Sequence, residues 1–408
     1  MKALVVAGGL PQAELLDNLK RRGITTVLVD MNEKCVARSH ADIFYPTSTL
    51  DVEGVKQVAI KENVDFLITV CADQVLLVVA EISEALNLPC YIDYETGKNV
   101  SDKCFMKRIF KENQVPTTDY VATTDLCLED LKHLKYPLVV KPVDAYSSRG
   151  VKKVTNPQEL ESAFYAAKEI SRSKNVIVEE FFEGQELTVD VYVENGNAHV
   201  LCVSALYKVP GNDKFVIHRG VYPAPYDKSV MDKIKQTADK IAKGFGLENT
   251  PMLIQLITDG KEISVVEFCA RTGGGIKFRC IKSTTGFDVV DAVVELTLGN
   301  KPKVEIKESG EMVINEFLYC EEGVFDHLEG FEELVNEGII KEYFQLKAKG
   351  TKLGQINSSG DRVACFTVSD TDKARLIQKH ATANARIKVL STEGKDILRH
   401  DVVGNLKI

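Results

Sequence analysis

Apolar residues in the first hundred positions fall into two alternating patterns. Unbroken apolar runs of about four to eight residues are typical of buried strands, and a spacing of three or four is typical of amphipathic helices. This alternation predicts an α/β sheet of parallel strands, whose ligands lie beyond the carboxyl ends of the strands. The predicted strands lie at residues 2–9, 25–30 and 65–70, and the predicted helices at 13–23, 52–64 and 75–88.

Gly8, Gly9 and Asp30 stand at those carboxyl ends. The segment AGGLPQAE lacks the G-x-G-x-x-G spacing of a dinucleotide-binding turn, so a nicotinamide or flavin site is not indicated. A pocket for another small molecule and a purely structural turn both remain open at this position.

From about residue 101 the pattern changes to hairpins mixed with helices. One helix is predicted with Ser101 or Asp102 as its cap, and another begins at Asn156, where Pro157 and Glu159 form a capping-box pattern. The other predicted elements are strands at 136–143, 151–154, 175–182 and 187–196, helices at 230–246 and 286–299, a hairpin over 252–268 that turns at Asp259 and Gly260, and a helix at 372–384 within the strand-rich residues from about 303.

Composition narrows the class of protein. The chain has 408 residues and a formal net charge of −8, a balance that argues against binding to nucleic acid or to anionic membranes. No apolar run approaches the roughly 20 residues of a membrane helix, and the N-terminal run is too short for a signal sequence. Ten cysteines without a C-x-x-C pair indicate buried reduced thiols rather than a zinc site. We therefore expect a cytoplasmic protein.

Lys141 stands near the end of the apolar strand at 136–143, just before the polar loop DAYSSRG at 144–150. Backbone N–H groups and hydroxyls of such a loop can fold over phosphates, and the lysine would neutralise phosphate oxygens. A lysine that ends a strand beside a solvated turn is the other interpretation, and this stretch alone does not separate the two.

Two glutamates and two aromatic residues follow in the segment VEEFFEGQE. Glu179 and Glu186 flank Phe181 and Phe182 at a strand end and a turn. Unpaired backbone groups at a strand exit can bind the edge of a purine, while Glu186 accepts hydrogen bonds from ribose hydroxyls. A plain hairpin with surface acids is the alternative.

An acid, a thiol and an arginine alternate in the segment SVVEFCARTGGG. Glu267, Cys269 and Arg271 should share one face of a strand, and Gln255 belongs to the other arm of the same hairpin. Two oxygen ligands on adjacent strands suit Mg²⁺, and the arginine can stabilise charge in phosphoryl transfer. Glycines 273–275 let the backbone approach a ligand. The alternative is a sheet with a Glu267–Arg271 salt bridge.

The order of the segments SDK, YPLVVKP, SSRG, VEEFFEGQE and VVEFCARTGGG resembles the ATP-grasp superfamily, over roughly residues 1 to 300. The carboxylate–amine ligase branch, including bacterial L-amino-acid ligases, is the nearest likeness. The resemblance implies an N-terminal parallel-sheet, Rossmann-like domain at 1–100 and an α+β ATP-grasp domain at 101–302. It also implies a small strand-rich, lid-like domain at 303–408.

The resemblance further implies an ATP site between two subdomains, with Mg²⁺, or alternatively Mn²⁺, bridging the phosphates. Carried over position by position, it assigns a role to twelve residues. Lys103 and Lys141 would bind the phosphates, and Ser147, Ser148 and Gly150 would form the loop over them. Glu179, Phe181 and Phe182 would frame adenine, Phe182 through its backbone, and Glu186 would hold the ribose. Glu267 and Gln255 would bind the metal, and Arg271, with Lys141, would be catalytic by steadying an acyl phosphate.

Two positions depart from the family pattern. Gln255 stands where an acid is usual, and Cys269 stands where asparagine is usual. A glutamine carbonyl is still a hard oxygen ligand, but a thiol is a poor partner for Mg²⁺. Either a single metal ion or a water in place of the thiol completes the site, or the catalytic step is impaired.

The expected activity is that of an ATP-dependent ligase. ATP would phosphorylate a small-molecule carboxylate, and an amine would then attack the acyl phosphate to form an amide, with ADP and phosphate released. Candidate substrate contacts are His218, Arg219 and Arg279. Dimers are usual in the resembled family, so a homodimer is considered. The alternatives are a purine-pathway enzyme like phosphoribosylglycinamide synthetase, a bicarbonate-activating enzyme, or a catalytically weakened ATP-binding protein.

Overall fold

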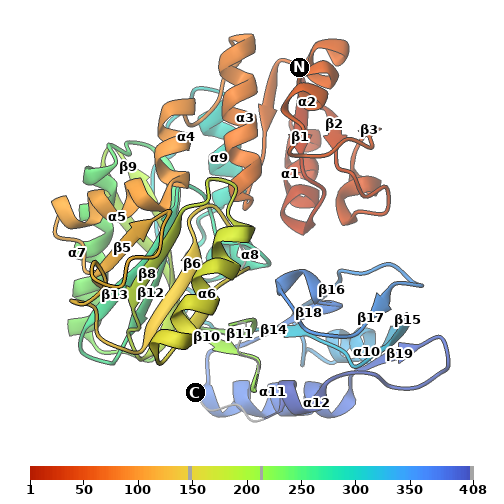
Figure 1. Ribbon diagram of the computed structural model, residues 1–408. Helices are drawn as coiled ribbons and strands as arrows, with labels where there is room; N and C mark the ends of the chain where they lie inside the picture. Colours follow the sequence, from red (N-terminus) through yellow and green to blue (C-terminus); the bar gives the residue numbers. More distant parts are fainter. Residues whose placement is uncertain (146–148, 212–214, 405–408) are drawn as a thin grey trace.

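The computed structural model describes residues 1–145, 149–211 and 215–404 (Figure 1). Four sheets organise these residues. No helix in this described part of the chain has both the length and the apolar character needed to cross a membrane.

The N-terminal sheet is parallel, with the order β3-β2-β1-β4, which confirms the predicted α/β fold of this region. Apolar side chains fill both of its faces, because helices cover the sheet on either side. Its elements are β1 (Lys2–Val6), α1 (Leu10–Arg21), β2 (Thr25–Val29), η1 (Val36–His40), β3 (Ile43–Tyr45), α2 (Val52–Glu62), β4 (Phe66–Ile68) and α3 (Asp73–Leu86).

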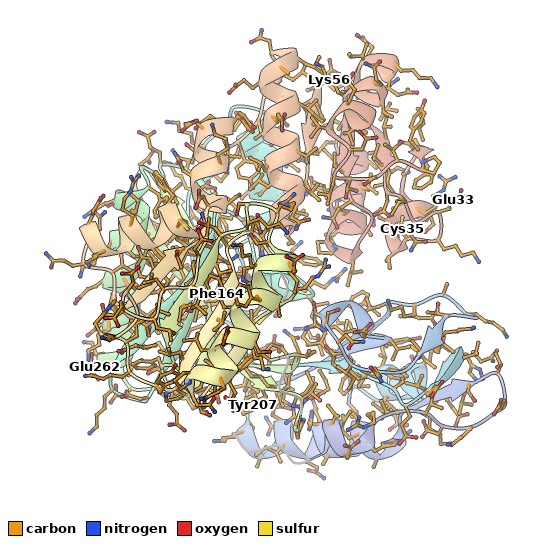
Figure 2. All side chains as sticks on the ribbon, viewed as in Figure 1. Glu33, Cys35, Lys56, Phe164, Tyr207 and Glu262 are labelled. Atoms are coloured by element: carbon orange, nitrogen blue, oxygen red, sulfur yellow. The ribbon has the colours of Figure 1, made fainter. Side chains whose placement is uncertain are left out.

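A small antiparallel sheet with the order β5-β8-β6-β7 follows. Its core packs against α6, where the fully buried Phe164 is labelled in Figure 2. The Asp102 carboxylate accepts N–H bonds at the start of α5, and Asn156 does the same for α6, so both predicted helix starts are confirmed. The elements are α4 (Tyr94–Ser101), α5 (Lys103–Glu112), β5 (Tyr120–Thr123), β6 (Leu138–Pro142), β7 (Lys152–Val154), α6 (Pro157–Ile170) and β8 (Val176–Glu180).

The largest sheet has eight strands in the order β13-β12-β9-β10-β11-β14-β18-β16. Strand β14 pairs with β11, so strands from the last third of the chain continue this sheet (Figure 1). Its elements and the helices packed on it are β9 (Gln185–Glu194), β10 (Asn197–Lys208), β11 (Ile217–Tyr222), α7 (Lys228–Gly244), β12 (Thr250–Thr258), β13 (Ile263–Cys269), α8 (Lys277–Thr285), α9 (Val289–Thr297), β14 (Met312–Leu318), β16 (Glu342–Gln345) and β18 (Ala364–Asp370).

The two faces of this sheet differ in character. Val189, Ile254 and Phe268 lie on the face that packs against α7, in one continuous apolar core. Because side chains alternate along a strand, the residues between them point to the opposite face. That opposite face carries the polar residues Asp190, Gln255 and Glu267, and α8 packs against the β10 part of the sheet.

The C-terminal elements complete the fold with a fourth sheet of three strands and with further helices. They are β15 (Gly323–Glu329), α10 (Phe331–Asn336), β17 (Lys352–Leu353), η2 (Ser359–Asp361), α11 (Lys373–Arg386), β19 (Lys388–Ser391) and α12 (His400–Val403).

One buried carboxylate joins this C-terminal part to the large sheet. Glu316 on β14 is fully buried and accepts from Arg219 Nε at 2.6 Å, and its oxygens lie 2.9 Å from ring nitrogens of His218 and His380. Burial alone would raise the pKa of Glu316, but these partners outweigh burial and lower it to about 2.

We expect Glu316→Gln to destabilise the protein by about 3 kcal/mol at pH 7, because it removes the charged acceptor of a buried cluster. Since the folded pKa of Glu316 is below the ordinary 4.5, this stabilisation is present above pH 4.5 and disappears as the pH falls toward 2. Urea unfolding at pH 7 measures the effect, with the exposed Glu305→Gln as the matched control. Equal unfolding midpoints for the two variants would contradict the prediction.

Candidate functional site

The hairpin β12–β13 places Gln255 directly opposite Glu267. The pairing skips one residue after this pair, since Leu256 is opposite Val265. Opposed residues in an antiparallel pair point to the same side, so the amide and carboxylate oxygens are neighbours on the polar face of the sheet.

Lys103, the first residue of α5, reaches this carboxylate. Its Nζ lies 3.2 Å from Glu267 Oε2 and donates to the carbonyl of Ala145 at 3.1 Å. One ammonium therefore connects the candidate metal ligand to the start of the loop between β6 and β7.

A buried carboxylate with two lysines lies in the small sheet. Glu179 Oε1 is 2.5 Å from Lys141 Nζ, and Glu179 Oε2 is 2.7 Å from Lys107 Nζ. Thr117 and Thr118 add hydrogen bonds to Lys107 and Glu179. Burial alone would raise the pKa of Glu179, but the two lysines outweigh it and lower the pKa to about 2. Burial lowers the pKa of Lys107.

The charges of this group do not cancel. Lys107, Lys141 and Glu179 are all less than a tenth exposed, and two ammonium groups share one carboxylate. A buried excess of positive charge favours an anionic ligand nearby. The sequence analysis missed Lys107, although its position four residues after Lys103 on the same helix face was a usable signal.

The residues expected around adenine and ribose lie just beyond β8. Phe181 carries the Lys153 ammonium 3.7 Å from its ring centre, and its N–H donates to the carbonyl of Pro137 at 3.0 Å. The N–H of Phe181 is therefore engaged, and Phe182 remains the candidate for a backbone contact with a base. Glu186 forms an ion pair of 2.9 Å with Lys208.

The loop expected over the phosphates joins β6 to β7. Asp144 accepts the N–H groups of Arg172 and Ser173, which ties the start of the loop to the end of α6. Gly150 has a positive φ of 78°, a conformation that L side chains rarely adopt. Ser147 and Ser148 lie outside the described residues.

Arg271 makes a two-pronged ion pair with Asp73, from the start of α3. The sequence alternative, a salt bridge from Arg271 to Glu267, is therefore not the arrangement observed. Burial alone would lower the pKa of Arg271, but Asp73 outweighs it and raises this pKa well above its usual value. Glu267, Cys269 and Arg271 line one small cavity together with Asp73 and Lys103.

Cys269 stands in that cavity as a neutral thiol. Burial and the neighbouring Asp73 raise its pKa well above the ordinary value, so the thiolate that would bind a metal is disfavoured. Among the residues that the structure describes, no group of three or more His, Cys, Asp or Glu side chains is arranged to hold a metal ion alone. A metal at this site would take further ligands from a bound molecule or from water.

The three candidate substrate contacts lie elsewhere. His218 and Arg219 belong to β11 and are buried against Glu316, where they form part of the structural ion-pair cluster. Strand β11 pairs with β10 on one side and, on the other, with β14 from the last third of the chain.

Arg279 is held between distant parts of the chain. It pairs with Glu14 of α1 at 2.8 Å and with Glu342 of β16 at 3.0 Å. Its guanidinium also lies 5.0 Å from the ring centre of Phe344. These contacts give Arg279 a role in joining the N-terminal and C-terminal parts.

The carboxyl ends of β1 and β2 border a separate hollow. Asp30 accepts the N–H groups of Gly8 and Asn32, and this turn faces residues 346–348 of the C-terminal part across the hollow. Gly8 is required there, because an added Cβ would lie 2.4 Å from the Cys35 sulfur.

The segment that carries these residues is similar to a known domain family. Residues 134–279 match the ATP-grasp domain family, a segment that contains Lys141, Glu179, Gln255, Glu267 and Arg271. The formate-dependent phosphoribosylglycinamide formyltransferase of Sulfurisphaera tokodaii is 27% identical over 66% of this chain and 70% of that enzyme. The D-alanine–D-alanine ligase of a Thermoanaerobacter species is 32% identical over 36% of this chain, which spans 44% of that ligase.

The same architecture occurs in a solved structure. The L-amino acid ligase from Bacillus licheniformis superposes with a TM-score of 0.79 at 20% identity, over 96% of this chain and 98% of that enzyme. This likeness extends the shared fold over nearly the whole chain. Residues 134–279 are thus identified as an ATP-grasp domain, as the sequence motifs predict.

Proposed function

We propose that this protein is an ATP-dependent carboxylate–amine ligase. ATP phosphorylates a small carboxylate to give an acyl phosphate, an amine attacks that carbonyl carbon, and phosphate leaves as the amide forms. ADP is the other product. The similarity to the D-alanine–D-alanine ligase, and the fold shared with the L-amino acid ligase, support this proposal.

The observation that carries the proposal is the meeting of cations and hard oxygen ligands from separate segments. Lys103 of α5 contacts Glu267 of β13, which stands opposite Gln255 of β12. Beside them Lys141 belongs to a buried group with excess positive charge. Such a set suits a triphosphate, because its charge needs both ammonium donors and a divalent cation.

The nucleotide would occupy the space between the small sheet and the large sheet. Lys103 and Lys141 would neutralise phosphate oxygens, and the residues after β8 would contact the base and ribose. Lys107 would hold Glu179 when Lys141 turns toward a phosphate, because each oxygen of Glu179 already has its own ammonium partner.

Glu267 and Gln255 fit Mg²⁺ or Mn²⁺, since both supply hard oxygen atoms on one face of adjacent strands. When bound, the ion neutralises phosphate charge and polarises the terminal phosphoryl group. An ion held by these two protein ligands would take its remaining ligands from phosphates and water.

Arg271 would steady the charge of the acyl phosphate. It now holds Asp73 with two donors, so it is already oriented toward the cavity that Glu267 and Lys103 line. A guanidinium fixed in this way costs little reorganisation at the moment of reaction. The loop after Lys141 would exclude water, which otherwise hydrolyses the acyl phosphate.

One observation favours a second candidate, an ATP-binding protein with weak catalysis. Cys269 is a neutral thiol in the cavity beside Glu267, where the family pattern has asparagine. Binding of nucleotide without metal-dependent turnover would then be the main activity. The formyltransferase relative also keeps open a purine-pathway substrate for the same ATP chemistry.

We expect pools of carboxylates and amines to stimulate ADP release, and Lys141→Met to weaken ATP binding by about 10- to 100-fold. The reason is that a charged hydrogen bond contributes about 1.5–3 kcal/mol. Lys132→Met, on an exposed lysine, is the matched control. Absence of stimulation by any pool, together with unchanged nucleotide affinity in Lys141→Met, would rule out the ligase.

Cys269→Asn separates the two candidates. If the thiol limits catalysis, asparagine restores a hard oxygen next to Glu267, and Mg²⁺-dependent ADP release should rise by tenfold or more, roughly 1.4 kcal/mol. If the wild-type site is complete with Glu267 and Gln255, the rate should stay within about threefold, well under that 1.4 kcal/mol. Titration with Mg²⁺ and Mn²⁺ at saturating ATP measures the change, and Cys127→Asn on the exposed thiol is the control.

A further inference from the structure

Four buried polar atoms without a hydrogen-bond partner gather behind the glycine run 273–275. They are Thr188 Oγ1, Asp190 Oδ2, Thr272 Oγ1 and Lys277 Nζ. Their residues are between 1% and 8% exposed. Only four other buried side-chain atoms in the described part of the chain share this condition, so the concentration at one place calls for an explanation.

The four atoms belong to two facing elements. Thr188 and Asp190 are two residues apart on β9 and point to the polar face of the sheet. Thr272 and Lys277 flank the glycines that cover this face. Asp190 ties the two sides together, because its Oδ1 accepts the Gly273 N–H at 3.2 Å and its Oδ2 lies 3.7 Å from Lys277 Nζ.

Asp190 and Lys277 form an ion pair that contains no hydrogen bond. A separation of 3.7 Å is too long for a hydrogen bond, although both groups are buried. Three N–H donors of the ammonium and one carboxylate oxygen therefore lack partners. Burial raises the pKa of Asp190, although Lys277 and the Gly273 N–H partly offset this effect.

The glycine run approaches Asp190 closely because Gly273 has no side chain. An added Cβ at Gly273 would lie 2.8 Å from Asp190 Oδ1, so any other residue there would push the run away. Helix α8 begins at Lys277 and has nine residues, and its first N–H groups add positive potential at the same point. These four residues, here termed the recess, offer an unpartnered acceptor at Asp190 and unpartnered donors at Lys277. The Thr188 and Thr272 hydroxyls belong to the same two segments of the chain.

The recess adjoins the candidate reaction site. Thr188 stands opposite Gln255, which stands opposite Glu267, so the three residues form one row across adjacent strands. Adjacent strands are about 4.8 Å apart, which puts Thr188 roughly 10 Å from Glu267. A molecule anchored in the recess can therefore extend a second group to the cavity of Arg271 and Glu267.

We propose that Thr188, Asp190, Thr272 and Lys277 form a binding recess for the head group of one substrate. Asp190 and Lys277 carry opposite charges, so the complementary head group is neutral overall and presents N–H donors beside an oxygen acceptor. The ammonium and carboxylate of an α-amino acid have this character, and so does a carboxamide. This inference rests on the proposed function, since it assigns the recess to a substrate of the ligase.

Entry to the recess requires the run 273–275 to move, because Lys277 Nζ is sealed from solvent. Glycine is suited to this movement, as the run has no side chains to lock it between β13 and α8. Once bound, the head group would complete the hydrogen bonds that are open in this structure.

Four small probes test the recess by binding, without turnover. Glycine and acetamide carry donors and an acceptor together, whereas acetate and methylamine carry only one kind. We expect saturable binding of glycine, acetamide or both to the full-length protein with ADP and Mg²⁺, and at least tenfold weaker binding of acetate and methylamine. The shift of the thermal midpoint and crystals soaked in each probe provide the readouts. Selective binding of glycine indicates an amino-acid head group, and selective binding of acetamide a carboxamide.

Variants locate the binding. For the probe that binds, Lys277→Met should weaken the affinity by at least tenfold, while the affinity for ADP stays unchanged. Lys277→Arg should recover part of the lost probe affinity. Lys282→Met, on an exposed lysine of the same helix, should have no effect. Because Lys277→Met leaves Asp190 buried and unpaired, the double variant Asp190→Asn with Lys277→Met keeps the test valid if the single variant does not fold.

Either of two results would contradict the proposed binding site. One is equal binding of all four probes, and the other is no binding of glycine and acetamide up to their solubility limits. Probe binding that is unchanged in both Lys277→Met and the double variant would do the same. Failure of the ligase reaction is a separate result, because it is measured as ADP release and these experiments measure binding.

Discussion

The alternation of side chains along β9, β12 and β13 is the constraint on which the site depends. Every second residue of these strands packs against α7, in a core that includes Val189, Ile254 and Phe268. The residues between them are thereby fixed on the other face, in register across the strands. A slip of one residue would bury Glu267 and Gln255 under α7 and expose the core, so apolar packing holds the polar face in place.

Buried charge is handled differently in three parts of the molecule. Glu316 is surrounded by Arg219 and two histidines, and this group is structural. Glu179 is matched by two lysines and leaves an excess of positive charge beside the candidate phosphate site. The pair of Asp190 and Lys277 is balanced in charge but unsatisfied in hydrogen bonds. The first arrangement favours stability, and the other two leave a deficit that a ligand can remove.

Local patterns explain which parts were predictable. The start of α5 at Asp102 and the shared face of Gln255 and Glu267 depend on neighbouring residues or on strand periodicity, and both follow from the sequence. The Asp73 partner of Arg271 lies 198 residues away in the chain, and no local pattern points to it. The buried position of Arg219 does not follow from a local pattern either, because β14 and α12 supply its partners.

The spacing of apolar residues also does not predict short or polar elements. Strand β3 has three residues, and α4 contains Gly97 and few apolar residues, so its start depends on the Asp93 side chain. Helix α8 begins directly after three glycines and buries Lys277, Thr284 and Thr285 along with its apolar residues. A stripe of apolar positions does not mark such a helix.

The double attachment of Arg279 has a mechanical consequence. By holding Glu14 and Glu342 at once, it braces the first helix and the last strand of the large sheet against α8. The small sheet β5–β8, in contrast, has an apolar core of its own, which includes Phe164 (Figure 2). The small sheet is therefore a unit with its own core, whereas α1, α8 and β16 are joined through Arg279.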